Sequence, residues 1–161
     1  MMKLLHILAV AVGGSLLALV VMLVFKAQAS KEGQAPGMYA GQLSPCSSKP
    51  NCVRSEAGTP ADKRVAPLPV ATSPEAAWQQ LAAAIESTGG VVVGRNDDYL
   101  AATYTSALFG FVDDLEARLD PAAGVIQLRS ASRQGHSDLG ANRTRVERLR
   151  QQYLTAGQGA R

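Results

Sequence analysis

The chain has 161 residues and a net charge of +3, and apolar residues make up 47% of it, many of them within the first 25 positions. Without that segment and the polar stretch after it, about 115 residues remain, the size of one ordinary domain. This remainder has an ordinary soluble composition, which argues against disorder. Residues 129–161 hold seven Arg against two acids. That excess is typical of a solvated helix face, but it also suits an anionic ligand or phospholipid headgroups.

The first predicted element is a membrane-spanning helix. Residues 4–25 carry no formal charge, and a helix of this length is about 33 Å long, enough to cross the hydrocarbon of a bilayer. A cleaved signal peptide is the alternative, with Lys3 before the apolar run and a small-x-small site at Ala27-Gln28-Ala29. Signal peptides have apolar cores of about 7 to 15 residues, so we expect residues 1–25 to be an uncleaved signal anchor.

The two cysteines favour a position outside the cytoplasm. Cys46 and Cys52 are the only cysteines and bracket a short turn that contains Pro50. A close pair of this kind is typical of a small disulfide loop in an exported domain. Free thiols or half of a metal site fit less well, because no His or further Cys lies nearby to complete a ligand set. The lysines on either side of the apolar run barely decide the orientation. We therefore expect a single-pass protein of a bacterial-type inner membrane, with its C-terminal domain on the periplasmic side.

Two segments without regular elements should follow the anchor. Residues 26–42 are polar and rich in Gly and Ala, which predicts a flexible tether. Residues 43–72 hold five prolines and the cysteine pair, which predicts an extended strap across the domain. A helix should then begin at Ser73-Pro74-Glu75, where an N-cap, a first-turn proline and an acid follow one another, and end at Gly89-Gly90.

Four strands and a last helix complete the predicted domain, residues 43–155. The strands are expected at 91–93, 99–108, 111–119 and 125–133, and Val146, Leu149 and Tyr153 recur at helical spacing after them. The order αββββα predicts an α+β fold, in which two helices cover one face of a four-stranded antiparallel sheet. Residues 156–161 are expected to be a disordered tail.

Asp113 is the most unusual residue of the predicted sheet, because alternation places it on the apolar face of its strand. A carboxylate there costs several kcal/mol unless it is paired and hydrogen-bonded. We expect an Arg from the stretch Arg129-Ser130-Ala131-Ser132-Arg133 to be its partner.

The densest polar stretch runs from residue 129 to residue 143, from the last strand into the last helix. A strand end, a Gly-containing loop and a helix N-terminus expose backbone N–H groups, and the Arg side chains add positive charge, so an anion would be favoured there. The predicted ligand-binding residues are Asp113, Asp114, Arg129, Ser130, Ser132, Arg133, Asp138, Asn142 and Arg143.

Two other interpretations of this stretch stay open. In a structural one, Ser137 or Asp138 caps the helix and Arg133 pairs with one of the adjacent aspartates. In a hydrolase, Ser130 or Ser132 would act with His136 and Asp138, but such triads are assembled from separate elements and no Gly-x-Ser-x-Gly motif is present. The paired aspartates at 97–98 and 113–114 match no calcium-loop spacing, so we expect no metal and no cofactor.

Three motifs resemble a known family. CSSKPNCV at 46–53, FGFVDD at 109–114 and RSASRQGHSDLGANRTRVERLR at 129–150 are similar to motifs of the domain-of-unknown-function 1499 family, over about residues 43–155. The matching positions are Cys46, Pro50, Asn51, Cys52, Asp113, Asp114, Arg129, Ser130, Ser132, Arg133, Gly135, Ser137, Asp138, Gly140, Asn142 and Arg143. His136 occupies a variable position of the motif, which weakens the triad. The resemblance implies membership and no particular reaction.

The expected function is therefore binding rather than catalysis. The partners would be the membrane, through residues 4–25, and an anionic small molecule, lipid headgroup or envelope protein at the polar stretch. Nucleic acid is a poor candidate, because aromatic residues make up only 5% of the chain and no RNA-binding motif is visible.

Overall fold

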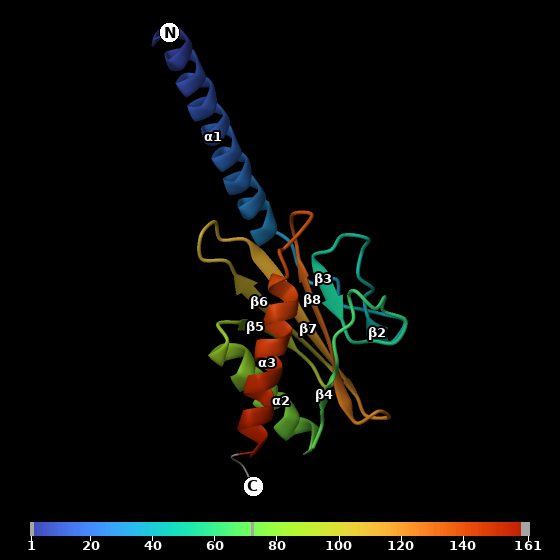
Figure 1. The fold of residues 1–161 in the computed structure, drawn as a ribbon. Coiled ribbons are helices and arrows are strands. Elements are labelled where there is room, and N and C mark those ends of the chain that lie inside the picture. The colour runs from blue at the N-terminus through green and yellow to red at the C-terminus, as the bar shows by residue number, and fades with distance from the viewer. Residues whose placement is uncertain (1, 72, 159–161) are drawn as a thin grey trace.

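The computed structural model describes residues 2–71 and 73–158 and shows a long helix that projects from an α+β domain (Figure 1). The elements in chain order are α1 (Met2–Lys31), β1 (Met38–Tyr39), β2 (Gln42–Leu43), β3 (Cys52–Arg54), β4 (Leu68–Pro69), α2 (Pro74–Ser87), β5 (Val91–Arg95), β6 (Tyr99–Thr105), β7 (Val112–Asp120), β8 (Val125–Ser132) and α3 (Ala141–Gln158).

Helix α1 is the one helix in the described part of the chain that is long and apolar enough to cross a membrane. Its apolar side chains are exposed along most of its length, whereas Ala27 and Ser30 in its last turns are buried against the domain. Residues 26–42, predicted as a flexible tether, thus include the end of α1 and all but the last residue of the small antiparallel hairpin of β1 and β2.

The main sheet has six strands in the described residues, not the predicted four. Its order is β3-β8-β7-β6-β5, β4 also pairs with β8, and all of these pairings are antiparallel. The predicted meander corresponds to β5–β8, and the extra strands come from the segment predicted as a strap without elements. The outer edge of β8 has backbone groups that need partners, and β3 and β4 supply them.

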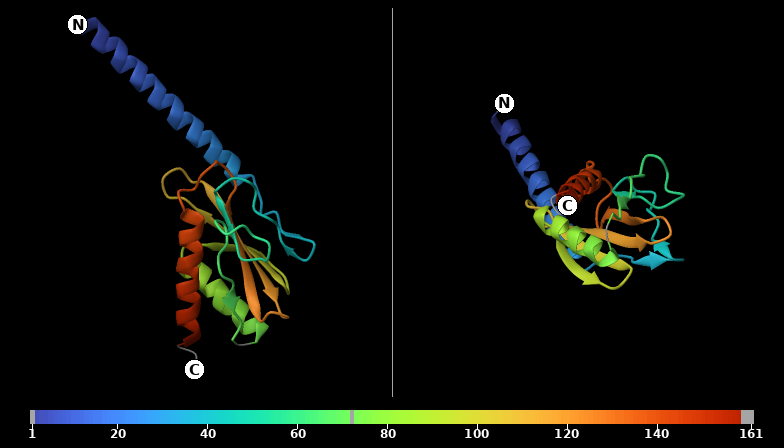
Figure 2. Two further views of the ribbon diagram at one scale, coloured as in Figure 1. Left: turned by 45° about the vertical axis from the view of Figure 1, so that its right-hand side comes forward. Right: turned by 90° about the horizontal axis from the view of Figure 1, so that it is seen from below.

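Both helices of the domain cover the same face of the sheet, as predicted (Figure 2). Ser73 caps α2, because its hydroxyl accepts a hydrogen bond from the Ala76 N–H at 3.3 Å. The core between the helices and the sheet includes Trp78, Leu81 and Leu149, and the Trp78 indole N–H donates to the Asp97 carbonyl. Of the predicted disordered tail, residues 156–158 continue α3, and residues 159–161 lie outside the described residues.

The opposite face of the sheet is covered as well, by residues 37–56. The Gly37 N–H donates to the Glu116 carboxylate at 2.8 Å, and the Leu43 N–H donates to the Glu56 carboxylate at 3.0 Å. Leu43 and Glu116 are both completely buried. Strands β7 and β8 are therefore buried on two sides, and their polar residues on either face must find partners inside the protein.

Candidate functional site

The disulfide predicted from the sequence is present and lies at the edge of the polar cluster. Cys46 and Cys52 are joined by an S–S bond of 2.04 Å. Cys52 belongs to β3 and pairs with Ala131 of β8, so the bond holds the strap beside the end of β8.

The adjacent aspartates of β7 lie on opposite faces of the sheet. Asp113, on the helix face, accepts a hydrogen bond from Arg145 Nη2 of α3 at 2.6 Å. Asp114, on the other face, accepts two from Arg133, at 2.7 and 2.9 Å. The partner of Asp113 is thus an Arg of the last helix, and the prediction that Arg129 or Arg133 would pair with it is wrong.

Asn142 is the centre of the polar network on the helix face. Its side chain is completely buried. Its amide NH₂ donates to the Asn51 carbonyl at 3.1 Å, the Ser132 hydroxyl at 3.1 Å and the Asp138 carboxylate at 2.7 Å. Its amide oxygen accepts from the Ser130 hydroxyl at 2.6 Å and from Arg145 at 2.5 Å. One amide thereby links α3, β8 and the strap.

Asp138 caps helix α3 from the preceding turn. Its carboxylate accepts hydrogen bonds from the Gly140 N–H at 3.1 Å and the Asn142 N–H at 2.8 Å. Burial alone would raise the pKa of the Asp138 carboxyl, but the hydrogen bonds from Asn142 and Gly140 outweigh it and hold that pKa below its usual value. These N–H groups were expected to receive an external anion, and the protein's own carboxylate occupies that position instead.

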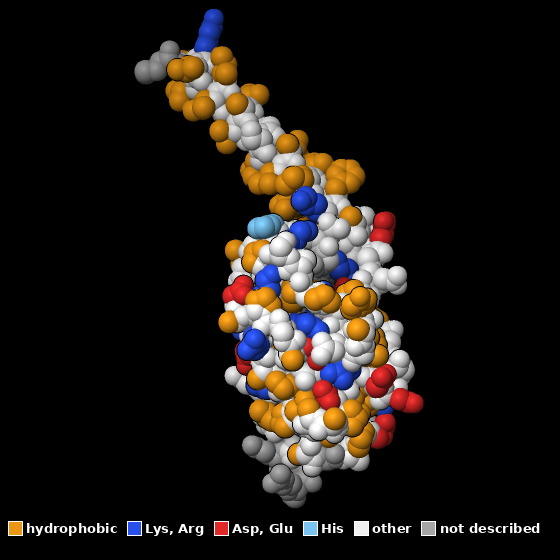
Figure 3. Space-filling view, turned by 90° about the vertical axis from the view of Figure 1, so that its right-hand side faces the viewer, with side chains coloured by type: hydrophobic (Ala, Val, Ile, Leu, Met, Phe, Trp, Pro, Cys, Tyr) orange, Lys and Arg blue, Asp and Glu red, His pale blue; other side chains and the backbone are white. Residues whose placement is uncertain are grey.

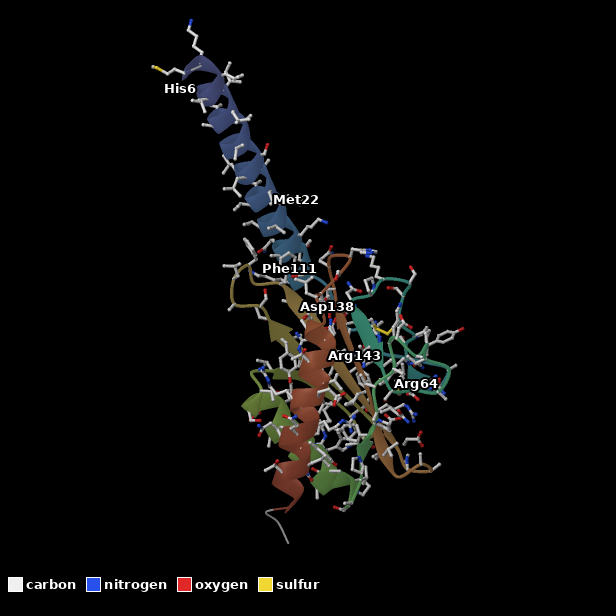
Figure 4. All side chains as sticks on the ribbon, viewed as in Figure 1. His6, Met22, Arg64, Phe111, Asp138 and Arg143 are labelled. Carbon is white, nitrogen blue, oxygen red and sulfur yellow. A yellow bond between two sulfur atoms is a disulfide. The ribbon has the colours of Figure 1, made fainter. Side chains whose placement is uncertain are left out.

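Three of the predicted ligand-binding arginines lie away from this network. Arg129 lies on the opposite face and donates to Glu116 at 2.6 Å. Arg133 also donates to the Ser30 carbonyl at the end of α1, at 3.1 Å. Arg143 points toward the strap, where it binds the carbonyls of Arg64 and Asp62 at 2.9 and 2.6 Å (Figure 4). Arg129 thus links β8 to β7, Arg133 links the end of α1 to the sheet, and Arg143 links the strap to α3.

A second buried network lies under residues 37–56. The Glu116 carboxylate accepts hydrogen bonds from Arg129, from the Tyr99 hydroxyl at 2.8 Å and from the Gly37 N–H. Burial raises the pKa of Glu116 above its usual value, although Arg129 and Tyr99 oppose this. Burial, with Glu116 beside it, also raises the pKa of Tyr99.

Glu56 forms a further ion pair on this face. It binds Arg118 through both carboxylate oxygens, at 2.8 and 3.0 Å. Sequence reasoning did not single out Glu116 or Arg118, because alternation placed them on the face of β7 that the predicted helices do not cover. It also missed Glu56, which lies in the segment predicted as a strap.

Arg145 is the residue of the helix-face network that sequence reasoning missed. Besides Asp113 and Asn142 it contacts the Ser130 hydroxyl at 3.1 Å, and its guanidinium lies 4.7 Å from the centre of the Tyr104 ring. The signal that could have found it is its spacing, since it follows Asn142 by three positions and precedes the buried Val146 on the same helix.

Among the described residues, no hydrogen bond links His136 to Ser130, Ser132 or Asp138, the groups named for a serine hydrolase. The Ser130 hydroxyl is completely buried and is bonded to Asn142 and Arg145. His136 is exposed in the turn before α3. Among the described residues, no group of three or more His, Cys, Asp or Glu side chains could hold a metal ion.

A cavity lies beside the polar network, between the start of α3, the end of α2 and the end of β6. Its volume is about 590 Å³, and we call it the α3 pocket. The lining residues are Thr88, Gly89, Tyr104, Thr105, Ser106, Asp138, Leu139, Ala141, Thr144, Arg145 and Arg148.

The two arginines of the α3 pocket differ in what they bind. Arg145 forms an ion pair with Asp113, whereas Arg148 is exposed and has no ion-pair partner among the described residues. Asp138, the acid of the lining, is already bonded to the start of α3. The pocket therefore has one cation available to a ligand.

The fold and this site define a class of protein: a small α+β domain with a buried polar network on each face of its sheet. An apolar N-terminal helix, which could be a membrane anchor or a signal sequence, precedes this domain. A family model described as "Protein of unknown function (DUF1499)" matches residues 42–153, and the chain belongs to this family. This confirms the resemblance noted in the three sequence motifs. A search of the curated proteins found no match.

Proposed function

We propose that this protein is a single-span membrane protein whose folded domain lies on the periplasmic side and binds an anionic group in the α3 pocket. The observation that carries the binding proposal is the unpaired Arg148 at a cavity of about 590 Å³. Most other polar residues of the predicted site already have partners inside the protein, so they build the pocket wall rather than contact the ligand.

The end of α1 supports an uncleaved anchor. The candidate cleavage site at residues 27–29 lies inside the continuous helix, and Ala27 is 3% exposed. Signal peptidases act on an extended, accessible segment, and this one is helical and partly packed against the domain. The disulfide between Cys46 and Cys52 supports an oxidising compartment and therefore favours a domain outside the cytoplasm.

The chemistry of the α3 pocket supports a small anion or the anionic group of a larger ligand. Arg148 supplies a charge, and the Thr144 and Ser106 hydroxyls supply hydrogen-bonding groups. Arg145 adds positive charge nearby, although Asp113 offsets much of it. Tyr104, Leu139 and Ala141 give the lining an apolar part, which suits a ligand with a hydrocarbon portion.

Thermal unfolding of the full chain in phosphatidylcholine nanodiscs tests this proposal, with inorganic phosphate, glycerol 3-phosphate and citrate as probes. A ligand at a hundred times its Kd stabilises the native state by about 2.7 kcal/mol, which raises the melting temperature by several degrees. We expect at least one probe to do so, and Arg148→Ala to abolish the shift.

Lys49→Ala is the matched control, because it removes one positive charge from the exposed disulfide loop, outside the α3 pocket. It should leave the shift unchanged. Equal loss of the shift in both variants would mean general charge screening and would overturn the proposed site, as would the absence of a shift with every probe.

A further inference from the structure

The end of the domain from which α1 emerges carries exposed apolar side chains. The loop between β6 and β7, residues 106–111, reads Ser-Ala-Leu-Phe-Gly-Phe, and Leu108 at its tip is 83% exposed. Leu139, in the turn before α3, is 98% exposed. Both connections lie at the end of the sheet next to α1 (Figures 1 and 2). Exposed apolar residues gathered at one place mark a surface that contacts another apolar phase.

The β6–β7 loop is closed by its own hydrogen bonds. The Ser106 N–H donates to the Phe111 carbonyl at 2.8 Å, and the Phe111 N–H donates to the Ser106 hydroxyl at 2.9 Å. The rings of Phe109 and Phe111 pack edge to face, 6.4 Å apart. The loop thus presents Leu108 in a defined position, so exposing it is a property of the fold.

The end of helix α1 is hydrogen-bonded to Val112, the residue that directly follows this loop. The Ser30 hydroxyl accepts a hydrogen bond from the Val112 N–H at 2.9 Å, and the Ser30 carbonyl accepts one from Arg133. The side chain of Lys31 lies beside Gly110, since a Cβ on this glycine would be 3.7 Å from the lysine Cε. The loop therefore keeps a fixed place relative to the end of α1.

The length of α1 locates the loop relative to a bilayer. The charge-free run ends at Phe25, so Lys26 marks the border of the hydrocarbon. Lys31 follows five residues later, about 7.5 Å further along the helix axis. The headgroup layer on each side of the hydrocarbon is about 5 to 8 Å thick. A helix along the bilayer normal would therefore place Lys31 near the outer border of that layer, and a tilted helix would place it deeper.

We propose that the domain docks on the surface of the bilayer that α1 spans, with Leu108 and Phe109 of the β6–β7 loop inserted among the lipid headgroups and upper acyl chains. Lys26 and Lys31 flank the insertion and suit lipid phosphates, and Lys and Arg side chains gather where the apolar helix meets the domain (Figure 3). Leu139 adds a second apolar contact at the same end. Because Ser106 and Leu139 also line the α3 pocket, docking would hold that pocket beside the lipid surface. This inference rests on the proposed membrane anchor.

The test uses the full chain in vesicles of phosphatidylethanolamine and phosphatidylglycerol. Leu108→Cys is labelled with the fluorophore NBD, while the native cysteines stay protected in their disulfide. The matched control is Ala122→Cys, which is exposed in the turn between β7 and β8 at the far end of the sheet (Figure 1). We expect the label at 108 to emit at shorter wavelength and to lose more than half its intensity to lipids with a nitroxide near the headgroup, and the label at 122 to do neither.

The outcomes separate docking from anchoring. Flotation of the vesicles first shows whether the protein is anchored. Protein that does not float would refute the anchor on which the inference rests. If the protein floats but the labels at 108 and 122 have the same emission wavelength and the same quenching by nitroxide lipids, docking is refuted and the membrane anchor is retained.

Discussion

Asp113 of β7 and Arg145 of α3 form an ion pair of 2.6 Å across the core, and each side chain is only 14% exposed. The same guanidinium contacts Asn142 and Ser130 and lies over the Tyr104 ring. A carboxylate on the apolar face of a strand is thereby compensated by a cation on the helix that covers it. The pair sets the position of α3 on the sheet, and with it the wall of the α3 pocket.

Breaking this pair should destabilise the fold. Arg145→Ala leaves the Asp113 carboxylate mostly buried without its cation, and we expect a loss of about 3 kcal/mol in the free energy of unfolding. Asp113→Ala should cost a similar amount, and the double variant should cost much less than the sum, as a double-mutant cycle in urea would show. Arg148→Ala, on the same helix, should change stability by less than about 0.5 kcal/mol. Additive losses would mean that the two side chains are not coupled.

Asp138 should make stability depend on pH at the acid side. Its folded-state pKa is lowered, so its contribution is fully present above the unfolded pKa of about 3.9 and is lost as the pH falls through the folded value. Asp138→Asn should therefore cost about 1 kcal/mol at pH 7, which is the difference between hydrogen bonds to a charged and to a neutral acceptor. The difference between wild type and variant should shrink as the pH falls below about 4, measured by urea unfolding at a series of pH values. A difference independent of pH would contradict the capping role of the charged carboxylate.

The disulfide should contribute measurably to stability. It closes a loop between residues separated by six positions, and the chain-entropy relation gives about 2 kcal/mol for a loop of this length. Reductant should lower the melting temperature of the wild type. A Cys46→Ala/Cys52→Ala variant should melt at the lower temperature with or without reductant. If reductant also lowered the melting temperature of that variant, the effect would not come from this bond.

Gly90 should tolerate no side chain, although the sequence marked it only as part of the predicted helix end at Gly89-Gly90. A Cβ atom there would lie 2.6 Å from both Ile85 and Tyr104, so Gly90→Ala should cost about 1 to 3 kcal/mol through overpacking. Gly94→Ala is the matched control, because a Cβ at Gly94 meets no atom within 4 Å. The melting temperatures of the two variants check this prediction. Equal melting temperatures would show that the end of α2 and β6 are not tightly packed at Gly90.

The fold of the central region could be predicted because its signals are local. Ser73 and Pro74 mark the start of α2, and residues 112–120 alternate as a strand does. The two additional strands of the main sheet could not be predicted in the same way. Residues 52–54 and 68–69 are short and lie near prolines, and they become strands only because the edge of β8 offers them hydrogen bonds.

The polar site was predicted as a region but not as an arrangement. The stretch from residue 129 to 143 does contain Asn142 and Asp138, the centre and the cap of the network. Its arginines are separated from its serines because successive strand residues point to opposite faces of the sheet. Arg129 and Arg133 lie on one face, and Ser130 and Ser132 lie on the other. Whether the predicted ligand-binding residues contact a ligand stays a prediction.

The amino-acid sequence by itself determined the apolar span, the cysteine pair, the α+β class and the family, because each depends on composition, spacing or local periodicity. Only the tertiary structure decided which polar group bonds to which. Arg145 reaches Asp113 from 32 positions away, Glu56 reaches Arg118 from 62, and Ser30 reaches Val112 from 82. Such pairs form because burial of both sheet faces removes water from the polar side chains, and each must then bond to whatever the fold brings beside it.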